Sequence, residues 1–358
     1  MITRRKVARY GGRSVRRPLV AVSISLALIA VSCGGEEVSG PDASNVDTTD
    51  AAEATESTEA SGSSTEEVGF PLTVSDCGRD LEFTESPESV LTVGVSAVAL
   101  LEAAGASDHI VGRTGEFGAA LPDDLDAAVG EVEVIDDFDP ALEAIVDADP
   151  DLVLGYGLFN TEASDVEAAG PLALTVTGEC GDAALPADKA DVGNFAVMVD
   201  DVRTYGQIFE TESEANAEAD DLESRIEAVK SDPPVTEITR AAGVYFFGEQ
   251  LSVTGQYNML HEQMATLGLT DVNEDLEEGF AEVSIESLLE DDPDLIILSY
   301  GFDGDDFETA KANLLAQPGA DTLQAVIDDR IVGLPASMRG PDPGAVDGLE
   351  LLAEELAN

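Results

Sequence analysis

The chain has 358 residues and is strongly acidic, with 74 Asp and Glu against 17 Lys and Arg and a formal net charge of −57. Nucleic acids and anionic lipid surfaces are bound through Lys and Arg, so this charge excludes both as partners. The length is sufficient for two folded lobes rather than one core.

The first 32 residues predict a secretory signal peptide. Seven basic residues and no acid occupy positions 1–17, and an apolar run follows over 19–31. That run is too short for a permanent membrane span, which needs about 20 apolar residues. A basic segment before a short apolar run is typical of export signals. Two adjacent arginines before the run also resemble a twin-arginine signal, so the export route stays open.

The end of this signal resembles a lipobox. Ala30-Val31-Ser32-Cys33 is similar to the sequence at which bacterial lipoproteins are cleaved and acylated. The resemblance implies a lipid anchor such as palmitate on Cys33 and a place at the extracytoplasmic face of the cell membrane. An ordinary signal peptide with an incidental Cys is the alternative. Lipidation would leave Cys77 and Cys180 to form a disulfide, or to remain two separate buried thiols.

Residues 33–68 predict a disordered tether, and the remainder predicts an α/β fold. The tether is rich in Ser, Thr, Glu, Asp, Ala and Gly and cannot bury enough apolar surface to fold. Beyond it, the apolar runs at 90–95, 151–155 and 295–299 are continuous rather than alternating. Such runs are typical of parallel strands that are covered on both faces.

An internal repeat predicts that this fold has two similar lobes. Residues 138–154 match residues 281–297 at a constant offset of 143, so Glu143 corresponds to Glu286. Each copy reads as a helix, a Pro-containing turn and a buried strand, followed shortly by Tyr-Gly. Two copies this far apart indicate two lobes, whereas a solenoid repeats at shorter intervals.

The predicted lobes span residues 69–190 and 233–358, with a connecting helix over 191–232. Apolar residues recur at helical spacing in that connection, which ends at a Pro-Pro pair, a strong helix stop. We expect one long helix. Two consecutive helices with a bend near Gly206 are the alternative.

Several motifs together resemble a known family. Phe70-Pro71-Leu72-Thr73-Val74 with Cys77-Gly78-Arg79 is similar to the opening of actinobacterial iron-complex binding lipoproteins. The first repeat copy is similar to class III solute-binding proteins, which serve importers of ferric siderophores, haem and cobalamin. Arg339-Gly340-Pro341 with Asp347-Gly348-Leu349-Glu350 matches that family's last strand-to-helix step. The likeness covers about residues 70–356.

The resemblance implies a fold, a function and partners. The fold is two Rossmann-like α/β lobes joined by a long helix, with the ligand in the cleft between them. The function is that of a monomeric extracytoplasmic solute-binding lipoprotein of an ABC importer, without a cofactor. It would capture an iron complex, above all a ferric siderophore, and deliver it to the permease and its ATPase.

The family also implies a docking role for Glu143 and Glu286. One carboxylate on each lobe would meet basic residues on the outer face of the transporter. These two charged contacts would orient the binding protein on the transporter. Ordinary solvated helix positions are the alternative in so acidic a chain.

The candidate ligand contacts are the side chains that follow the apolar strands, because ligands of open α/β sheets bind beyond the carboxyl ends of the strands. These side chains are Ser96, Arg113, Tyr156, Phe247, Tyr257, Tyr300 and Arg339. Arg and Tyr suit an organic, partly anionic iron chelate better than a bare cation. Packing of the aromatic residues in the core and pairing of the Arg residues with acids are the alternatives. Asp136 and Asp137 stand where some hydroxamate-binding relatives carry Arg, which argues against a hydroxamate.

Other functions remain as alternatives. The chain has only two His, His109 and His261, too few for a typical transition-metal site, so we expect no metal site. A receptor for haem, cobalamin or a hard cation held by carboxylates stays open. The sequence contains no nucleophile elbow, P-loop, dinucleotide fingerprint or His-Glu-x-x-His motif, so we expect no catalytic residues and no enzyme. A surface sensor or adhesion lipoprotein and an extracellular carboxylate-based hydrolase are the alternatives of another class.

Overall fold

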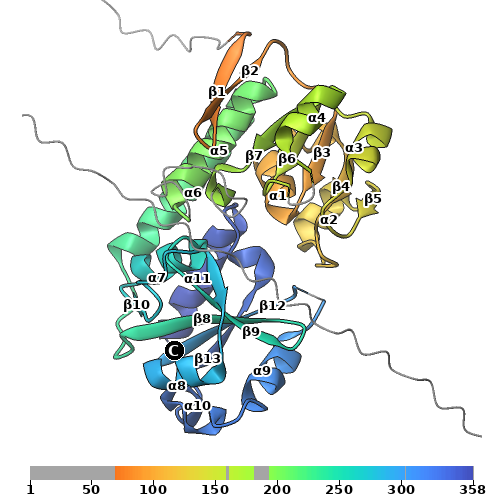
Figure 1. Ribbon diagram of the computed structural model, residues 1–358. Coiled ribbons are helices and arrows are strands. Elements are labelled where there is room, and N and C mark those ends of the chain that lie inside the picture. Colours follow the sequence, from red (N-terminus) through yellow and green to blue (C-terminus); the bar gives the residue numbers. More distant parts are fainter. Residues whose placement is uncertain (1–68, 159–160, 181–192, 303, 358) are drawn as a thin grey trace, which may run out of the picture. The chain divides into compact units, whose positions relative to one another are not determined.

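A computed structural model describes residues 69–158, 161–180, 193–302 and 304–357 (Figure 1). The predicted signal peptide, Cys33 and the predicted tether lie outside the described residues. Among the helices of the described residues, none combines the length and the apolar character that a membrane span requires.

The first lobe is built on a five-stranded parallel sheet of order β5-β4-β3-β6-β7. Its strands are β3 (Val90–Val93), β4 (Ile110–Thr114), β5 (Val134–Asp136), β6 (Leu152–Gly155) and β7 (Leu172–Thr175). The helices between them are α1 (Val95–Ala103), α2 (Asp123–Val129), α3 (Leu142–Ala148) and α4 (Ala163–Ala169). Every residue of β3 and β6 is buried, as expected for strands covered on both faces.

A hairpin precedes this sheet and fastens to its β7 edge. It consists of β1 (Leu72–Asp76) and β2 (Arg79–Phe83), which pair antiparallel. The backbone N–H of Thr175 in β7 donates to the Asp76 carboxylate at 3.0 Å, and the Arg79 guanidinium donates to the carbonyl of Ala173 at 2.5 Å. These bonds occupy polar groups of an edge strand that would otherwise be open to pairing with another chain.

A disulfide joins the same hairpin to the end of β7. Cys77 lies in the turn between β1 and β2, and Cys180 follows the short helix η2 (Thr177–Glu179). Their Cα atoms lie 5.4 Å apart and their sulfur atoms are bonded. The hairpin is thus attached to the lobe covalently as well as by hydrogen bonds.

The second lobe is built on a mixed sheet of order β11-β9-β8-β12-β13, with β10 beside β8. Its strands are β8 (Arg240–Phe247), β9 (Gln250–Thr254), β10 (Thr270–Asp271), β11 (Phe280–Glu282), β12 (Leu295–Tyr300) and β13 (Ile331–Pro335). Strands β8, β12 and β13 are parallel, whereas β9 returns antiparallel beside β8. The helices are α7 (Met259–Thr266), α8 (Ile285–Asp291), α9 (Phe307–Leu315), α10 (Gln324–Ile327) and α11 (Gly344–Ala357).

The sequence repeat is also a structural repeat. Helix α3 and strand β6 form its first copy, and α8 and β12 form its second. Each helix ends in a residue of left-handed conformation, Asp149 with φ 50° and Asp292 with φ 41°. The predicted fold class, two α/β lobes with parallel strands, is confirmed.

The Asp of each Pro-Asp-Leu motif explains why the motif recurs. The Asp151 carboxylate accepts the backbone N–H of Ser89 at 3.0 Å, immediately before β3. The Asp294 carboxylate accepts the backbone N–H of Arg240 at 3.0 Å, at the start of β8. In both lobes one carboxylate therefore ties the beginning of the repeated strand to its central neighbour and satisfies a backbone donor.

Two helices, not one, occupy the connecting segment. They are α5 (Phe195–Ile208) and α6 (Glu212–Ser231), so the expected single helix over 191–232 is wrong and the alternative with a break near Gly206 is correct. Glu210 takes φ 58°, and the N–H of Thr211 turns back to the carbonyl of Gly206 at 2.8 Å. Gly206 also contacts the Cβ of Ala215, an approach that a side chain would prevent.

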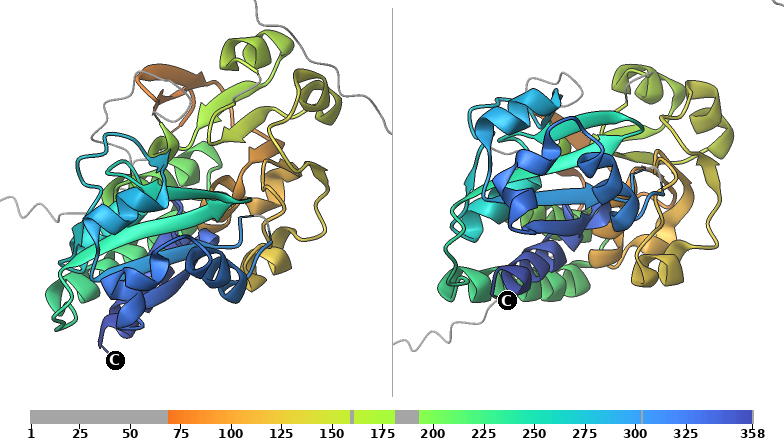
Figure 2. Two further views of the ribbon diagram at one scale, coloured as in Figure 1. Left: turned by 60° about the horizontal axis from the view of Figure 1, so that its bottom comes forward. Right: turned by 90° about the horizontal axis from the view of Figure 1, so that it is seen from below.

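Helix α6, 20 residues long, is the long connection and is bonded to both lobes. Just before it begins, the Thr211 hydroxyl donates to the carbonyl of Ala104 in the first lobe at 2.6 Å. Farther along, the Arg225 guanidinium binds Asp347 and Glu350 of α11, which lies alongside α6 (Figure 2). Several bonds at separate points restrain how one lobe can move against the other.

A direct contact between the lobes is centred on Asp342. Its side chain is only 2% exposed and accepts two hydrogen bonds, from the Ser96 hydroxyl at 2.6 Å and from the backbone N–H of Gly344 at 2.9 Å. The neighbouring Pro341 contacts Gly178 so closely that no side chain would fit there. Burial raises the pKa of Asp342 from its ordinary value of 3.8 to about 6, although both hydrogen bonds oppose that rise.

Replacement of Asp342 should change how stability depends on pH. The folded protein holds the Asp342 proton up to about pH 6, whereas the unfolded chain releases it near 3.8, so its contribution to the free energy of unfolding falls as pH rises through that window. The D342N variant should lack this fall and be about 1–3 kcal/mol more stable than wild type at neutral pH, but of similar stability near pH 4. Urea unfolding at both pH values measures the effect.

The exposed Asp321 provides the control. D321N removes the same charge from the same lobe and should retain the wild-type pH dependence. An unchanged pH dependence in D342N would contradict the assignment of this buried carboxyl.

Candidate functional site

The first lobe has a topological switch point at β3. The chain continues from β3 to β4 and β5 on one side and returns to β6 and β7 on the other. Ligands bind at such points, beyond the carboxyl ends of the strands. Tyr156 follows β6 directly, and its ring covers this position. A Cβ atom at Gly94 would lie 2.7 Å from the ring, and one at Gly115 would lie 2.6 Å from the hydroxyl, so the two glycines make room for the Tyr side chain.

Phe117, Phe138 and Tyr156 form a first aromatic cluster at the strand ends of this lobe. The rings of Phe117 and Phe138 meet edge to face with centroids 5.7 Å apart, and Phe117 stacks on Tyr156 at 6.1 Å. Phe138 is 59% exposed and Phe117 is 36% exposed. Exposed aromatic rings gathered at a switch point offer a flat apolar surface to a ligand.

Tyr245, Phe280 and Phe302 form a second aromatic cluster, on the other lobe. The Tyr245 ring lies 5.0 Å from that of Phe302 and 6.3 Å from that of Phe280. The guanidinium of Arg339 lies over two of these rings, with its Cζ atom 4.9 Å from the Tyr245 centroid and 4.5 Å from the Phe302 centroid. Cation–π contacts hold this guanidinium beside the aromatic surface.

The loops that carry Phe117 and Phe302, one ring from each cluster, lie next to each other. Phe117 precedes Gly118 in the loop after β4, and Phe302 lies in the loop after β12. A Cβ atom at Gly304 would be 3.8 Å from the carbonyl oxygen of Gly118. A ligand between the strand ends would therefore meet aromatic rings from both lobes.

Arg113 belongs to β4 rather than to the loop after it, and its charge is countered internally. The side chain is 6% exposed, lies 3.3 Å from the Glu116 carboxylate and is 3.4 Å from the carbonyl oxygen of Val132. Burial raises the pKa of Glu116, and the Arg113 charge opposes that rise. Arg113 therefore stabilises the charged form of the Glu116 carboxylate. Part of this guanidinium's hydrogen-bonding capacity is already occupied.

Among the described residues, several carboxylates lie near Tyr156 of the first cluster. Burial raises the pKa of Tyr156, and the nearby carboxylates of Asp139, Glu179 and Asp136 raise it further. Asp136 also accepts the backbone N–H of Phe138 at 3.0 Å, which fixes the turn that carries this ring. The aromatic surface is thus bordered by carboxylates.

The structure brings Ser96, Tyr156 and Arg339 to the strand ends where ligands are expected. Tyr156 belongs to the first cluster and Arg339 to the second. Ser96 lies in the first turn of α1, and its hydroxyl donates a hydrogen bond to Asp342. Of the four remaining candidates, Arg113 lies in β4 as described above.

The other three candidates lie at separate places. Tyr300 ends β12 and packs against Phe307 with ring centroids 5.9 Å apart. Its side chain is partly buried against the hydrophobic core of the second lobe. Phe247 ends β8 and is 45% exposed. Tyr257 lies just before α7 and is half-buried. Its backbone N–H donates to the carbonyl of Glu278.

Of the aromatic residues in the two clusters, the sequence predicted only Tyr156 as a ligand contact. Phe117 lies between Gly115 and Gly118 in the loop after a strand, and Phe302 follows the repeated Tyr-Gly pair, so both had a local signal near a strand end. Phe138 begins the repeated block and Phe280 stands just before its second copy. Nothing in the linear sequence indicates that Phe280 and Tyr245 meet, because that contact depends on the pairing of β11 with β9.

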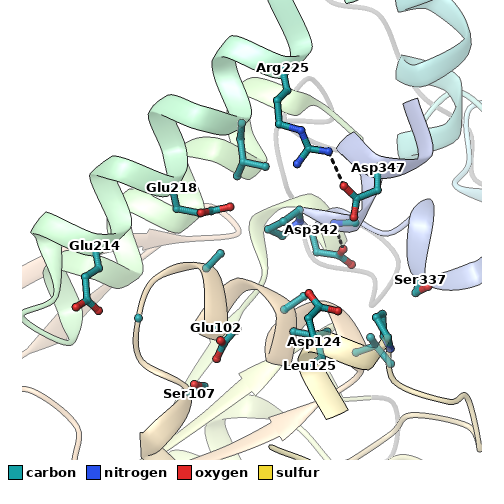
Figure 3. Close-up of a pocket in the computed structure, with 18 of the residues that line it drawn as sticks. Glu102, Ser107, Asp124, Leu125, Glu214, Glu218, Arg225, Ser337, Asp342 and Asp347 are labelled. Atoms are coloured by element: carbon teal, nitrogen blue, oxygen red, sulfur yellow. Dashed lines mark hydrogen bonds and ion pairs between the residues drawn. The ribbon is translucent and has the colours of Figure 1, made fainter. Parts of the chain in front are cut away.

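A separate cavity of about 740 Å³ lies among α1, α2, α6 and the start of α11 (Figure 3). None of the described residues that line it is aromatic, and its acidic side chains include Glu102, Asp124, Glu214, Glu218 and Asp347. Its Arg225 is already bound by Asp347. The cavity therefore lacks the aromatic surfaces that the two clusters offer, and the clusters are taken as the candidate site.

Glu143 and Glu286 occupy equivalent exposed positions. Each stands in the first turn of the repeated helix, α3 in one lobe and α8 in the other. Hydrogen bonding by Ser284 and by its own backbone lowers the pKa of Glu286, so this carboxylate is charged at neutral pH. Their docking role stays a prediction.

The histidines have structural partners. His261 lies 3.1 Å from the Asp271 carboxylate, and His109 packs against Phe209 with ring centroids 5.0 Å apart. Within the described residues there is no group of three or more His, Cys, Asp or Glu side chains arranged to hold a metal ion.

Comparisons with known proteins agree with this architecture. A family model described as periplasmic binding protein matches residues 90–338. A crystal structure of an ABC-type Fe3+-hydroxamate transport system from Saccharomonospora viridis is 28% identical, with a TM-score of 0.70, and the match covers 81% of this chain and 100% of that one. No curated protein sequence matches the chain.

Two more distant structures share the fold. The periplasmic vitamin B12 binding protein of Vibrio cholerae is 19% identical, with a TM-score of 0.59 and coverage of 76% of this chain and 97% of that one. The periplasmic heme binding protein of Vibrio cholerae is 16% identical, with a TM-score of 0.58 and coverage of 76% and 100%. The resemblance to class III solute-binding proteins is therefore confirmed. The chain belongs to the periplasmic binding protein family, whose members bind solutes for transport and are not enzymes.

Proposed function

We propose that this protein captures an iron complex, above all a ferric siderophore, outside the cytoplasm and delivers it to an ABC permease and its ATPase. The observation that carries the proposal is the pair of aromatic clusters on the two lobes, with Arg339 held over the second. The relative from Saccharomonospora viridis, named for Fe3+-hydroxamate transport, supports an iron complex as the ligand.

The chemistry of the clusters favours an organic complex over a bare cation. Aromatic rings bury apolar surface of a ligand, and a guanidinium donates hydrogen bonds to the oxygens that chelate its metal. A hard cation would instead need several oxygen ligands converging on one point. Haem and cobalamin also present large apolar faces, and the two binding proteins of Vibrio cholerae share this fold, so both molecules belong in the test.

Arg339 should contribute to ligand binding. R339A should weaken binding of a ferric complex by roughly 1.5–3 kcal/mol, because a charged hydrogen bond is lost. Titration with ferric hydroxamates, ferric catecholates, haem and cobalamin, followed by Tyr fluorescence or calorimetry, measures this.

The matched control is R330A. Arg330 stands just before β13 of the same lobe and pairs with Asp328 at 3.4 Å, so its removal changes the net charge equally. Equal ligand affinities of R339A and wild type would show that Arg339 does not contribute to ligand binding. Failure of wild type to bind any of the four ligand classes would refute the proposed function.

Cys33 should anchor the protein to the membrane. The lipobox-like sequence before it supports this proposal, and the disulfide between Cys77 and Cys180 is consistent with an oxidising, extracytoplasmic compartment. C33A should move the protein from the membrane fraction to the medium or periplasm, as measured by fractionation and immunoblotting. Membrane retention of C33A equal to wild type would rule out the lipid anchor.

Glu143 and Glu286 should dock the protein on its permease as a monomer. Their equivalent exposed positions on α3 and α8 support two-point contact with basic residues of the permease. The double variant E143Q/E286Q should reduce ligand uptake by cells at least about tenfold, because two charged contacts are lost, and should bind ligand as wild type does.

The control D147N/E290Q changes two exposed carboxylates on the same two helices and should leave uptake near the wild-type rate. Equal uptake by both double variants would reject the docking role.

A further inference from the structure

We infer that Ser96 is a positioning residue for the ligand: its hydrogen bond to Asp342 in the other lobe holds the segment that carries Arg339, and this support strengthens ligand binding. The inference rests on the proposed function, because Arg339 is a proposed ligand contact. The sequence predicted Ser96 as a ligand contact itself. In the structure its hydroxyl donates to Asp342 at 2.6 Å, so Ser96 acts on the ligand through the second lobe.

Arg339 lies in the connection between β13 and α11, which its own lobe holds from one side. The side chain of Gln263 in α7 is fully buried. Its amide nitrogen donates to the carbonyl oxygens of Met338 at 2.8 Å and of Ala345 at 2.7 Å. The first of these bonds fixes the residue immediately before Arg339.

The first lobe holds the connection on the other side of Arg339. A Cβ atom at Gly340 would lie 2.7 Å from the Ser96 hydroxyl oxygen, so the backbone immediately after Arg339 packs against the bond between Ser96 and Asp342. The next residue, Pro341, also contacts the first lobe. The backbone at Arg339 is therefore supported from both lobes.

The cavity among α1, α2, α6 and α11 lies beside this bond (Figure 3). Asp342 and Gly344 are among the residues that line it. Because this side of the connection faces a cavity rather than closely packed side chains, hydrogen bonds supply more of its restraint.

The Asp342 carboxylate depends on its donors, because its side chain is only 2% exposed. It accepts the Ser96 hydroxyl and the backbone N–H of Gly344, the latter at 2.9 Å. Loss of a donor makes burial of a carboxylate more costly. Without the Ser96 hydroxyl, Asp342 would turn toward water in the cavity and take the connection with it.

The consequence for the ligand is one of orientation. A guanidinium is a planar fork and binds chelating oxygens well only when the fork faces them. The Cζ atom of Arg339 lies 4.9 Å from the Tyr245 centroid and 4.5 Å from the Phe302 centroid. A mobile connection would move this group among several arrangements, and each one that does not face the ligand lowers the apparent affinity.

Hydrogen exchange of the ligand-free protein tests the support itself. In S96A the amides of residues 336–345 should exchange at least about fivefold faster than in wild type, because their anchor to the first lobe is lost. The control T211A removes a hydroxyl bond of the same length, 2.6 Å, to Ala104 at the opposite end of α1. It should leave the exchange of residues 336–345 at the wild-type rate.

A double-mutant cycle tests whether Ser96 acts through Arg339. The probes are a ferric tris-hydroxamate and a ferric tris-catecholate. S96A should raise the dissociation constant at least about fivefold in the wild-type background but less than about twofold in the R339A background. T211A should change it less than about twofold in either background.

D342A breaks the same bond from the second lobe and provides a second variant. It should accelerate exchange of residues 336–345 and weaken binding at least as much as S96A does. Thermal melts establish that the variants are folded, and D342A takes the place of S96A if S96A is not.

The outcomes separate this inference from the proposed function. Unchanged exchange of residues 336–345 in S96A, or equal acceleration in S96A and T211A, would overturn the support by Ser96 and leave iron-complex binding intact. Equal effects of S96A on affinity in the two backgrounds would overturn the route through Arg339. Binding of neither ferric complex by wild type would refute the proposed function and the ligand part of the inference, whereas exchange without ligand still decides whether Ser96 holds the connection.

Discussion

The burial of parallel strands on both faces is the constraint on which the rest of the molecule depends. Strands such as β3, β6 and β12 have almost no exposed side chains, because helices cover both surfaces of each sheet. A ligand can then reach the sheets only at the strand ends, where the chain must turn. Phe117, Tyr156 and Phe302 lie beside such turns, as do Arg339 and Ser96, whereas Tyr245 lies within β8.

The two lobes meet this constraint with the same local device. In each, a left-handed residue ends a helix, and the Asp two residues later binds the start of the neighbouring strand. The side chains at the strand ends nevertheless differ, because one lobe presents Phe117 and Phe138 and the other presents Arg339 and its rings. Similar scaffolds thereby carry unlike side chains at the candidate site.

Internal ion pairs occupy several of the Arg side chains in this acidic chain. In a chain with so few cations, each Arg that forms an internal pair is withdrawn from ligand binding, as Arg113 is by Glu116 and Arg225 is by α11. Arg339 lies over the rings of Tyr245 and Phe302 at the second cluster.

The sequence by itself determined the two-lobed α/β architecture and the strands that form its core. Continuous apolar runs and an exact repeat offset depend on local patterns, which a linear reading detects, and the family resemblance rests on the same motifs. The connection was less determined, since the break between α5 and α6 requires the turn at Glu210 and the contact of Gly206 with Ala215.

The site was decided mainly by the tertiary structure. Tyr156 and Arg339 stood after strands and could be selected, but the meeting of Tyr245 with Phe280, the pairing of Arg113 with Glu116 and the bond of Ser96 to Asp342 join residues through strand pairing, burial or contact between lobes. A sequence specifies which side chains are available at each turn. Which of them remain available to a ligand depends on the partners that folding brings to them.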